Sequence, residues 1–162
     1  MFPSSASSSG DVVYVSMPPG TIPEGGLATI SDPRTGGQAQ AAMAAGGFDP
    51  VAILANAGDT LTLDVELVGG RHETRSLGVP VTRPPVVVRT EPPPRKRDVP
   101  LNAPVVVVFS EPIDSASLGG IRLLHGGAPV GGRVTLSADH LLVRFQPDQV
   151  LTPNSDYVIA VS

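Results

Sequence analysis

Apolar and polar residues alternate in residues 58–70, so that every second position is apolar. The apolar positions are Leu61, Leu63, Val65 and Leu67, and the polar positions are Thr62, Asp64 and Glu66. This period of two predicts a β-strand with one buried face and one solvent-exposed face. Gly69 and Gly70 follow, and the pair predicts a two-residue hairpin turn into a second strand over residues 71–77.

Shorter apolar runs separated by Gly, Pro, Asp and Ser predict the remaining strands. In the first half these strands span residues 11–17, 27–31, 38–43 and 51–56. In the second half they span residues 86–90, 105–110, 121–124, 130–137, 141–145 and 156–161, with a turn at residues 137–140. Residues 39–45 are rich in Ala and would also suit a helical turn, but their flanking glycines and short length favour a strand.

Glycine and proline make up a large part of the chain, with 18 of each among 162 residues. Each would cost the interior of a helix about 1–3 kcal/mol, which excludes long helices. Disorder is not favoured either, because 41% of the residues are hydrophobic and 16% are charged. Turn signals that recur roughly every 8–12 residues are typical of a β-sandwich, so the sequence predicts an all-β protein.

Prolines at positions 80, 84, 85 and 92–94 predict a domain boundary near residues 80–85. Residues 11–82 and 83–162 are then two tandem β-sandwich domains of about 75 residues with a Pro-rich junction. The Ser-rich residues 1–10 lack the cationic and apolar regions of a signal peptide and predict a flexible linker. No run approaches the roughly 18 apolar residues that a membrane span requires, so we expect no membrane insertion.

The formal net charge of −4 comes from 11 basic and 15 acidic side chains. Binding to nucleic acid requires a concentrated positive face, which neither half of the chain has, so nucleic acid is not an expected partner. Three consecutive cations, Arg95, Lys96 and Arg97, could contact an acidic partner or a phosphate. Glu91 and Asp98 flank them, which favours a solvated surface.

Loop carboxylates are the candidate metal ligands, because the chain has no cysteine and its three histidines show no ligand spacing. The histidines are His72, His125 and His140, and exposed turn positions are expected for them. The carboxylates that lie beside Gly, Ser or Thr in predicted loops are Asp32, Asp59, Asp114 and Asp139. Such carboxylates could gather a calcium ion. No run matches an EF-hand loop, so capping of turns is the favoured interpretation.

Catalytic motifs do not occur in the sequence, which has no Gly-x-Ser-x-Gly elbow, no His-Glu-x-x-His pair and no phosphate loop. Residues 126–132 are rich in glycine, but they separate two predicted strands and precede no helix. They therefore predict a hairpin connection and not a phosphate site. We therefore expect that the protein is not an enzyme and that it has no catalytic residues and no cofactor; calcium is the candidate metal.

Residues 151–157 have the form of a tyrosine corner, in which a tyrosine hydroxyl returns to the backbone a few residues upstream. Leu151, Pro153 and Tyr157 carry this pattern. Together with Phe109 and Phe145, Tyr157 is expected to fill the core of the second domain. The alternative is a surface tyrosine that stacks on a ligand.

The second half resembles a known family at several separated segments. These are residues 88–92 with 98–102, residues 105–114, residues 141–147 and residues 151–157. In order and spacing they are similar to a bacterial Ig-like domain of the S-layer-protein (SbsA) type, over about residues 86–162. Members of this family usually continue past the last of these strands, so the resemblance implies that the sheet lacks its last strand here.

Residues 27–70 loosely resemble the small prealbumin-like or Ig-like sandwiches that precede such domains in bacterial surface proteins. The points of resemblance are residues 30–36, 46–48 and 57–61. The two resemblances together imply two tandem Ig-like or prealbumin-like β-sandwich domains.

Alternation in residues 105–109 predicts that Val106 and Val108 point away from the core, where such a strand normally carries polar groups. The run of valines at residues 86–88 raises the same question. We expect these apolar positions to help bury a contact with a neighbouring domain.

The family resemblance implies a non-catalytic structural, spacer or adhesion module of a bacterial cell-surface or secreted protein, located outside the cell. Its partners would be neighbouring domains of a longer chain and a glycan or protein of the cell envelope. The alternatives are a carbohydrate- or protein-binding module and an accessory domain of a secreted hydrolase. Carbohydrate stacking requires exposed aromatic rings, and only Phe2 and Tyr14 lie outside the predicted cores.

Overall fold

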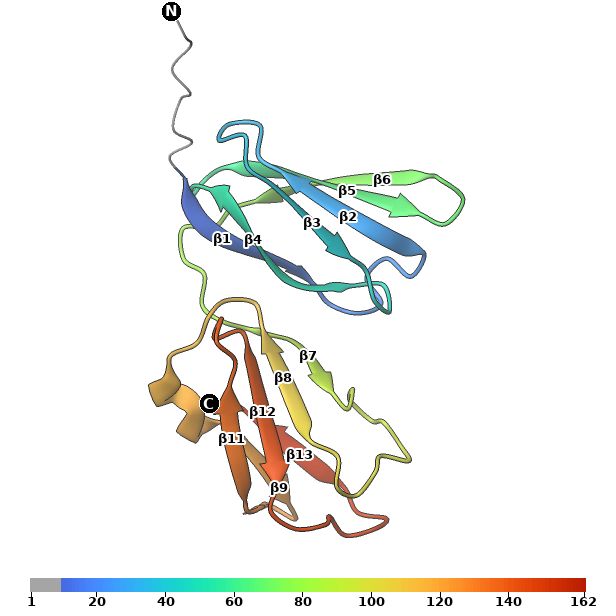
Figure 1. The fold of residues 1–162 in the computed structure, drawn as a ribbon, viewed down its shortest axis with the longest axis vertical. Coiled ribbons are helices and arrows are strands. Elements are labelled where there is room, and N and C mark those ends of the chain that lie inside the picture. The colour runs from blue at the N-terminus through green and yellow to red at the C-terminus, as the bar shows by residue number, and fades with distance from the viewer. Residues whose placement is uncertain (1–9) are drawn as a thin grey trace, which may run out of the picture. The chain divides into compact units, whose positions relative to one another are not determined.

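The computed structural model describes residues 10–162, and every sheet in it is antiparallel (Figure 1). The predicted linker at residues 1–10 lies, apart from Gly10, outside the described residues. The chain divides into two compact units, with the first ending at Pro84 and the second spanning residues 85–162. Within the described part of the chain, no helix has the length and apolar character needed to span a membrane.

The first unit contains two sheets that face each other across a hydrophobic core. Its strands are β1 (Asp11–Met17), β2 (Gly25–Ser31), β3 (Gln38–Ala42), β4 (Phe48–Ala55), β5 (Thr60–Leu67) and β6 (His72–Gly78). One sheet is the pair β1-β4, and the other has the strand order β3-β2-β5-β6. Residues 38–42 form a strand, so the helical alternative for residues 39–45 is wrong.

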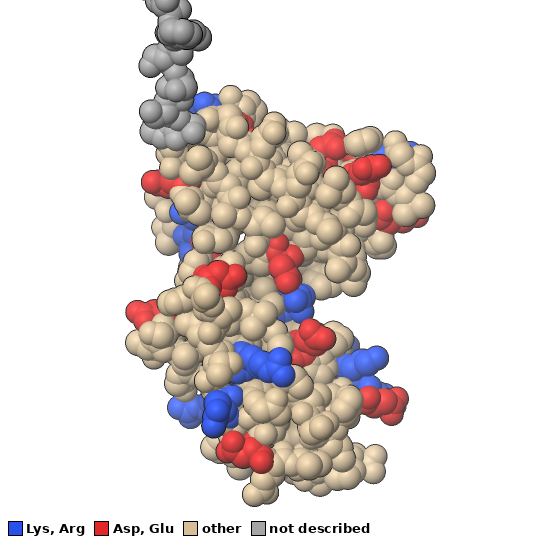
Figure 2. All heavy atoms as spheres, viewed as in Figure 1, with Lys and Arg blue, Asp and Glu red and all other residues tan. Residues whose placement is uncertain are grey.

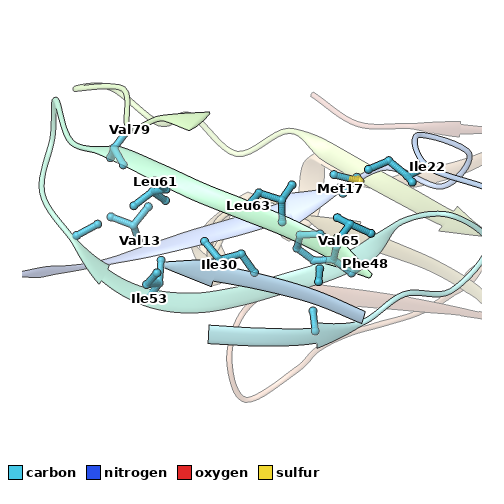
Figure 3. Close-up of a cluster of buried hydrophobic side chains, with 13 residues drawn as sticks. Val13, Met17, Ile22, Ile30, Phe48, Ile53, Leu61, Leu63, Val65 and Val79 are labelled. Carbon is cyan, nitrogen blue, oxygen red and sulfur yellow. The ribbon is translucent and has the colours of Figure 1, made fainter. Parts of the chain in front are cut away.

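The core of the first unit is filled from both sheets (Figure 3). In β5 the alternating residues Leu61, Leu63 and Val65 are at most 2% exposed, as their period of two predicts. They pack in one cluster with Val13 of β1 and Ile53 of β4. Burying an aliphatic side chain of this size contributes about 1.5–3 kcal/mol relative to leaving it exposed. This burial fixes which residues of β5 face the solvent.

The hairpin between β5 and β6 has a longer loop than the predicted two-residue turn. Leu67 N donates a hydrogen bond to Arg71 O (2.7 Å), so three residues form the loop, and both of its glycines have positive φ (86° and 74°). Glycine adopts this backbone conformation without steric cost. The predicted turn is therefore wrong by one residue, and the true register places Thr74 opposite Asp64, where a two-residue turn would place Arg75.

The second unit is also built from two facing sheets. Its elements are β7 (Val87–Glu91), β8 (Val105–Phe109), the 3₁₀-helix η1 (Ser115–Gly120), β9 (Arg122–His125), β10 (Ala128–Pro129), β11 (Gly132–Leu136), β12 (Leu142–Pro147) and β13 (Tyr157–Ala160). The first sheet has the order β11-β12-β8-β7, and the second has the order β10-β9-β13. Among the described residues, β13 is paired along one edge only, with β9.

The core of the second unit lies between these sheets. Phe109 and Phe145, the predicted aromatic core residues, are 4% and 6% exposed. Val107 of β8 and Val143 of β12 pack in one cluster with Phe109, and Leu123 of β9, from the other sheet, packs in a second cluster with Phe145. Alternation within β8 and β12 therefore sends one set of side chains into the core and the other set to the outer face of the first sheet.

The strand predictions are confirmed to within a few residues of their bounds. The hairpin connection predicted over residues 126–132 is wrong as a single connection, because β10 lies within it and β11 belongs to the other sheet; only residues 126–127 form a hairpin turn, between β9 and β10. The prediction missed η1 and β10. Both elements are too short to show a hydrophobic period: β10 has two residues, and the six-residue η1 ends in two glycines. Their positions depend on the turns around them.

The valines at residues 86–88, which lead into β7, and the valines of β8 differ in exposure. Val86 and Val87 are 58% and 42% exposed, whereas Val88 is buried. In β8, Val106 is partly exposed, but Val108 is 2% exposed although it lies on the same side of the strand. A contact of these valines with a neighbouring domain stays a prediction.

Candidate functional site

A buried carboxylate closes the turn between β2 and β3. Asp32 is 1% exposed, and its Oδ1 accepts a hydrogen bond from Arg34 N (2.8 Å). The Thr35 hydroxyl lies within hydrogen-bond distance of both Asp32 Oδ2 (2.9 Å) and Leu54 O of β4 (2.7 Å). An aspartate that binds the backbone two residues onward forms an Asx-turn. The Asp32 turn is thereby fixed and also attached to the end of β4.

A second carboxylate, Asp59, holds the turn between β4 and β5. Its side chain is 4% exposed, and Oδ2 accepts a hydrogen bond from Asn56 N (2.7 Å). Arg34 Nε donates a hydrogen bond to Asp59 Oδ1. This bond to the guanidinium lowers the pKa of Asp59 to about 2 against the opposing effect of burial, and it raises the pKa of Arg34.

Arg34 therefore joins two turns that are distant in sequence. Its backbone N–H binds Asp32, and its guanidinium binds Asp59 and carries the positive charge that both carboxylates face. Residues 10–162 contain no group of three or more acidic, histidine or cysteine side chains suited to a metal ion. We call Asp32, Arg34 and Asp59 the turn clamp, because the hydrogen bonds of these residues hold two turns together.

The other two candidate carboxylates lie in the second unit. Asp114 is the N-cap of η1, and its side chain accepts a hydrogen bond from Ala116 N (2.9 Å). Asp139 Oδ1 accepts hydrogen bonds from Ser137 Oγ (2.5 Å) and Leu141 N (3.2 Å), and the serine bond lowers the pKa of Asp139. All four candidate calcium ligands thus accept hydrogen bonds from the backbone of their own turns.

The tyrosine of the second unit anchors the segment before β13. Thr152 N donates a hydrogen bond to the Tyr157 hydroxyl (2.8 Å), which is the hydrogen bond of a tyrosine corner. The Tyr157 ring is partly buried and packs with Leu151 against the core, while Pro153 O accepts a hydrogen bond from Ser155 Oγ (3.2 Å). The corner therefore connects the turn at residues 151–156 to the β10-β9-β13 sheet.

The Tyr157 ring also stacks on His125, its cross-strand neighbour in β9. The ring centroids are 4.8 Å apart, and the ring planes are inclined by 24°. Aromatic pairs on adjacent strands contribute to sheet stability, so this contact holds β13 against β9. His125 therefore has a packing role that the turn interpretation of the sequence missed.

The exposed face of β5 and β6 carries a polar cluster that the sequence interpretation also missed. His72 Nδ1 lies 2.7 Å from Asp64 Oδ1, and Thr74 Oγ1 donates a hydrogen bond to Asp64 Oδ2 (3.0 Å). The contact between His72 and Asp64 lowers the pKa of Asp64 and raises the pKa of His72. The expected turn position of His72 is wrong, because the residue begins β6; the correct hairpin register would have revealed the pair.

The hydroxyl, carboxylate and imidazole of this polar cluster are not arranged as they are in a catalytic site with a hydroxyl nucleophile. A hydroxyl nucleophile is activated by an imidazole that lies between it and a carboxylate. In this cluster the Asp64 carboxylate lies between the Thr74 hydroxyl and the His72 imidazole. The arrangement therefore stabilises the hairpin and does not prepare Thr74 for attack.

Comparison with known protein families gives a match to the second half of the chain. Residues 81–162, which include the whole second unit, match the sequence model of a family described as a bacterial Ig-like domain. A search of curated proteins finds no match to this chain. The matched segment covers half of the chain and includes both facing sheets of the second unit and its tyrosine corner.

Proposed function

The chain belongs to the bacterial Ig-like domain family, and from this premise we propose that it is a non-catalytic structural module of a bacterial cell-surface or secreted protein. Domains of this family are typically structural modules of bacterial surface proteins and are generally non-catalytic. The observation that carries the proposal is the family match across residues 81–162. It supports a spacer or adhesion role outside the cell.

The use of the polar side chains supports this proposal. Asp32, Asp59, Asp114 and Asp139 bind the backbone of their own turns. Their hydrogen-bonding capacity serves the fold, which suits a module whose task is to keep its shape. A sandwich fold by itself does not specify an activity, so support for the proposal comes from the family and from these contacts.

We propose further that the two units are tandem domains of one array. The second unit would be a domain of the S-layer-protein (SbsA) type, and residues 11–82 would be an Ig-like or prealbumin-like sandwich. Support comes from the two facing sheets of each unit and from the segments of each unit that resemble these families. The partners would be neighbouring domains of a longer chain together with a glycan or protein of the envelope.

Protease treatment of intact cells of the source bacterium tests the proposed location. An antibody raised against the 162-residue chain measures the amount of intact protein before and after treatment. A cytoplasmic protein, measured in the same samples, is the control. We expect the signal to disappear from intact cells, or to be found in the medium, while the control survives. A signal that survives in intact cells and is lost only after lysis would overturn the proposal.

A further inference from the structure

The loop between β7 and β8 presents three consecutive cations to the solvent. Arg95, Lys96 and Arg97 are all exposed, and none of them forms an ion pair within residues 10–162. Figure 2 shows basic side chains in blue on the viewed face of the second unit, interspersed with acidic ones in red. Charges that have no partner among the described residues are available to a ligand.

The backbone of this loop is held in a defined turn. Lys96 N donates a hydrogen bond to Pro93 O (3.1 Å), which places Pro94 and Arg95 at the two central positions. Arg95 has a φ of 62°, which the third residue of a type II turn requires and which favours glycine or asparagine. A charged residue thus occupies a position where glycine would be less strained. Such outliers are a reason to ask for a function.

Two further cations extend the positive charge over the adjoining sheet. Val134 and Phe145 point into the core, so alternation places Arg133 of β11 and Arg144 of β12 on the outer face. Both arginines are exposed, and neither forms an ion pair within the described part of the chain.

The end of the loop at Asn102 adjoins the outer face of the sheet. Gln146 lies opposite Arg133 in the register, and Gln146 Nε2 donates a hydrogen bond to Asn102 O of the loop (3.3 Å). We call Arg95, Lys96, Arg97, Arg133 and Arg144 the basic surface.

The acidic residues near the basic surface are fewer. Glu91 lies 3.6 Å from Arg89, so its charge already has a partner. Asp98 belongs to the same loop, and Asp148 follows β12. The cations of the loop follow β7, and Arg133 lies in β11 at the opposite edge of the sheet; these two strands are about 14 Å apart at the usual strand spacing. A single small anion cannot span that width, whereas a polymer with repeated negative groups can.

We propose that the basic surface binds an anionic polysaccharide through the phosphate or carboxylate groups of that polymer. Guanidinium groups bind both anions through paired hydrogen bonds, and four of the five cations are arginines. The five positions include no aromatic anchor of the kind that usually dominates protein interfaces. The choice of a polysaccharide rests on the proposed location at the cell surface. The fixed turn reduces the entropy that binding would otherwise cost.

Chromatography of the 162-residue chain on three celluloses tests the proposal. Phosphocellulose and carboxymethylcellulose carry the two anions on the same polymer, and unmodified cellulose is the neutral control. The chain has a net charge of −4, so retention on an anionic resin at pH 7 requires a local basic surface. We expect retention at low salt on one or both charged resins, release by salt, and none on cellulose. The two charged resins distinguish a phosphate polymer from a carboxylate polymer.

Two variants of equal net charge separate the basic surface from general charge. The variant R95Q/K96Q/R97Q should flow through the charged resins, whereas R71Q/R75Q/R122Q, with cations removed elsewhere, should elute like the natural chain. Circular dichroism confirms that each variant is folded. The variant R133Q/R144Q, which leaves the strained turn intact, should elute at lower salt and provides a second test.

Several outcomes would overturn the proposal. They are a natural chain that flows through both charged resins, equal elution of the loop variant and its charge-matched control, and stronger binding to duplex DNA than to either soluble polymer at equal anion concentration. The last outcome would identify nucleic acid as the partner. The binding test uses purified polymers, so a negative result would not bear on the proposed location at the cell surface. That location is tested separately by protease treatment of intact cells.

Discussion

Arg34 and Asp59 lie in different turns of the first unit, and the Arg34 guanidinium donates a hydrogen bond to the Asp59 carboxylate. The arginine side chain is 61% exposed, whereas the aspartate side chain is 4% exposed. An exposed cation thus satisfies a buried anion. Removing one partner of such a pair leaves the other charge without compensation, and that loss exceeds the gain the pair provides.

Substitution of Arg34 by Met should destabilise the first unit. The change Arg34→Met keeps the aliphatic stem and removes every donor, so the pKa of Asp59 should rise from about 2 toward its ordinary value of 3.8. Urea unfolding measures the loss as a lower midpoint, and an NMR titration follows Asp59. Arg71→Met is the control, because Arg71 and Glu24 are both exposed. Equal midpoints for the two variants would contradict the role of the turn clamp.

Acid should weaken the same contact within a defined pH range. Because the pKa of Asp59 is lowered to about 2 from 3.8, its ionised form stabilises the fold above pH 3.8. That contribution is lost as the pH falls through the folded value of about 2. Melting temperatures are measured at pH 7, 4, 3 and 2 for the natural chain and for Asp59→Asn. The natural chain should melt at a higher temperature than the variant at pH 7, and the difference should become small near pH 2. A difference in melting temperature that stays the same at all four pH values would show that ionised Asp59 does not stabilise the fold.

The pair of His72 and Asp64 should stabilise the fold less as the pH rises through the neutral range, which is the opposite of the pH dependence expected for Asp59. Its hydrogen bond raises the pKa of His72 above 6.5, so the contribution is complete below pH 6.5 and is lost as the pH rises through the raised value. The stability difference between the natural chain and His72→Gln should be larger at pH 5.5 than at pH 8.5. Asp64→Asn should abolish the same pH step, and salt should reduce it. A pH-independent difference would exclude a charged pair.

Sequence patterns predicted the strands because alternation is a local property. Leu61, Leu63 and Val65 show their period without reference to any other part of the chain. The register of β5 against β6 depends on how many residues form the turn. The predicted turn was one residue too short, so the predicted register did not place His72 and Asp64 together. No local pattern encodes contacts between distant turns.

The turn clamp illustrates this limit on prediction. The segment at residues 32–36 predicts a capped turn, and Asp32 caps it. The partner of Arg34 lies 25 residues further along the chain, so it becomes visible only when β2 and β5 are paired. The tyrosine corner differs, because Tyr157 and Thr152 are five residues apart and the pattern contains both.

Removal of the Tyr157 hydroxyl should destabilise the second unit by about 1 kcal/mol, the usual contribution of one hydrogen bond. Tyr157→Phe keeps the ring and its stacking on His125, but it leaves Thr152 N without its acceptor. Tyr14→Phe is the matched control, since the Tyr14 hydroxyl forms no hydrogen bond within residues 10–162. Denaturant midpoints compare the two variants. An unchanged midpoint for Tyr157→Phe would show that the hydrogen bond of the tyrosine corner does not stabilise the second unit.

The two units should unfold as separate cooperative domains. Each has its own buried core, so a cavity in one core should lower the stability of that unit alone. Leu63→Ala should cost the first unit about 2–5 kcal/mol, and Phe145→Ala should cost the second about 3–5 kcal/mol. For domains of this size, each kcal/mol lowers the melting temperature by about 4–8 °C.

Calorimetry of the 162-residue chain with hydrogen exchange tests this independence. Leu63→Ala should shift one transition and speed exchange in β2 and β5, whereas Phe145→Ala should shift the other and speed exchange in β8 and β12. Each variant serves as the control for the other. A single transition that both substitutions shift equally, with faster exchange throughout, would mean that the two cores fold as one cooperative unit.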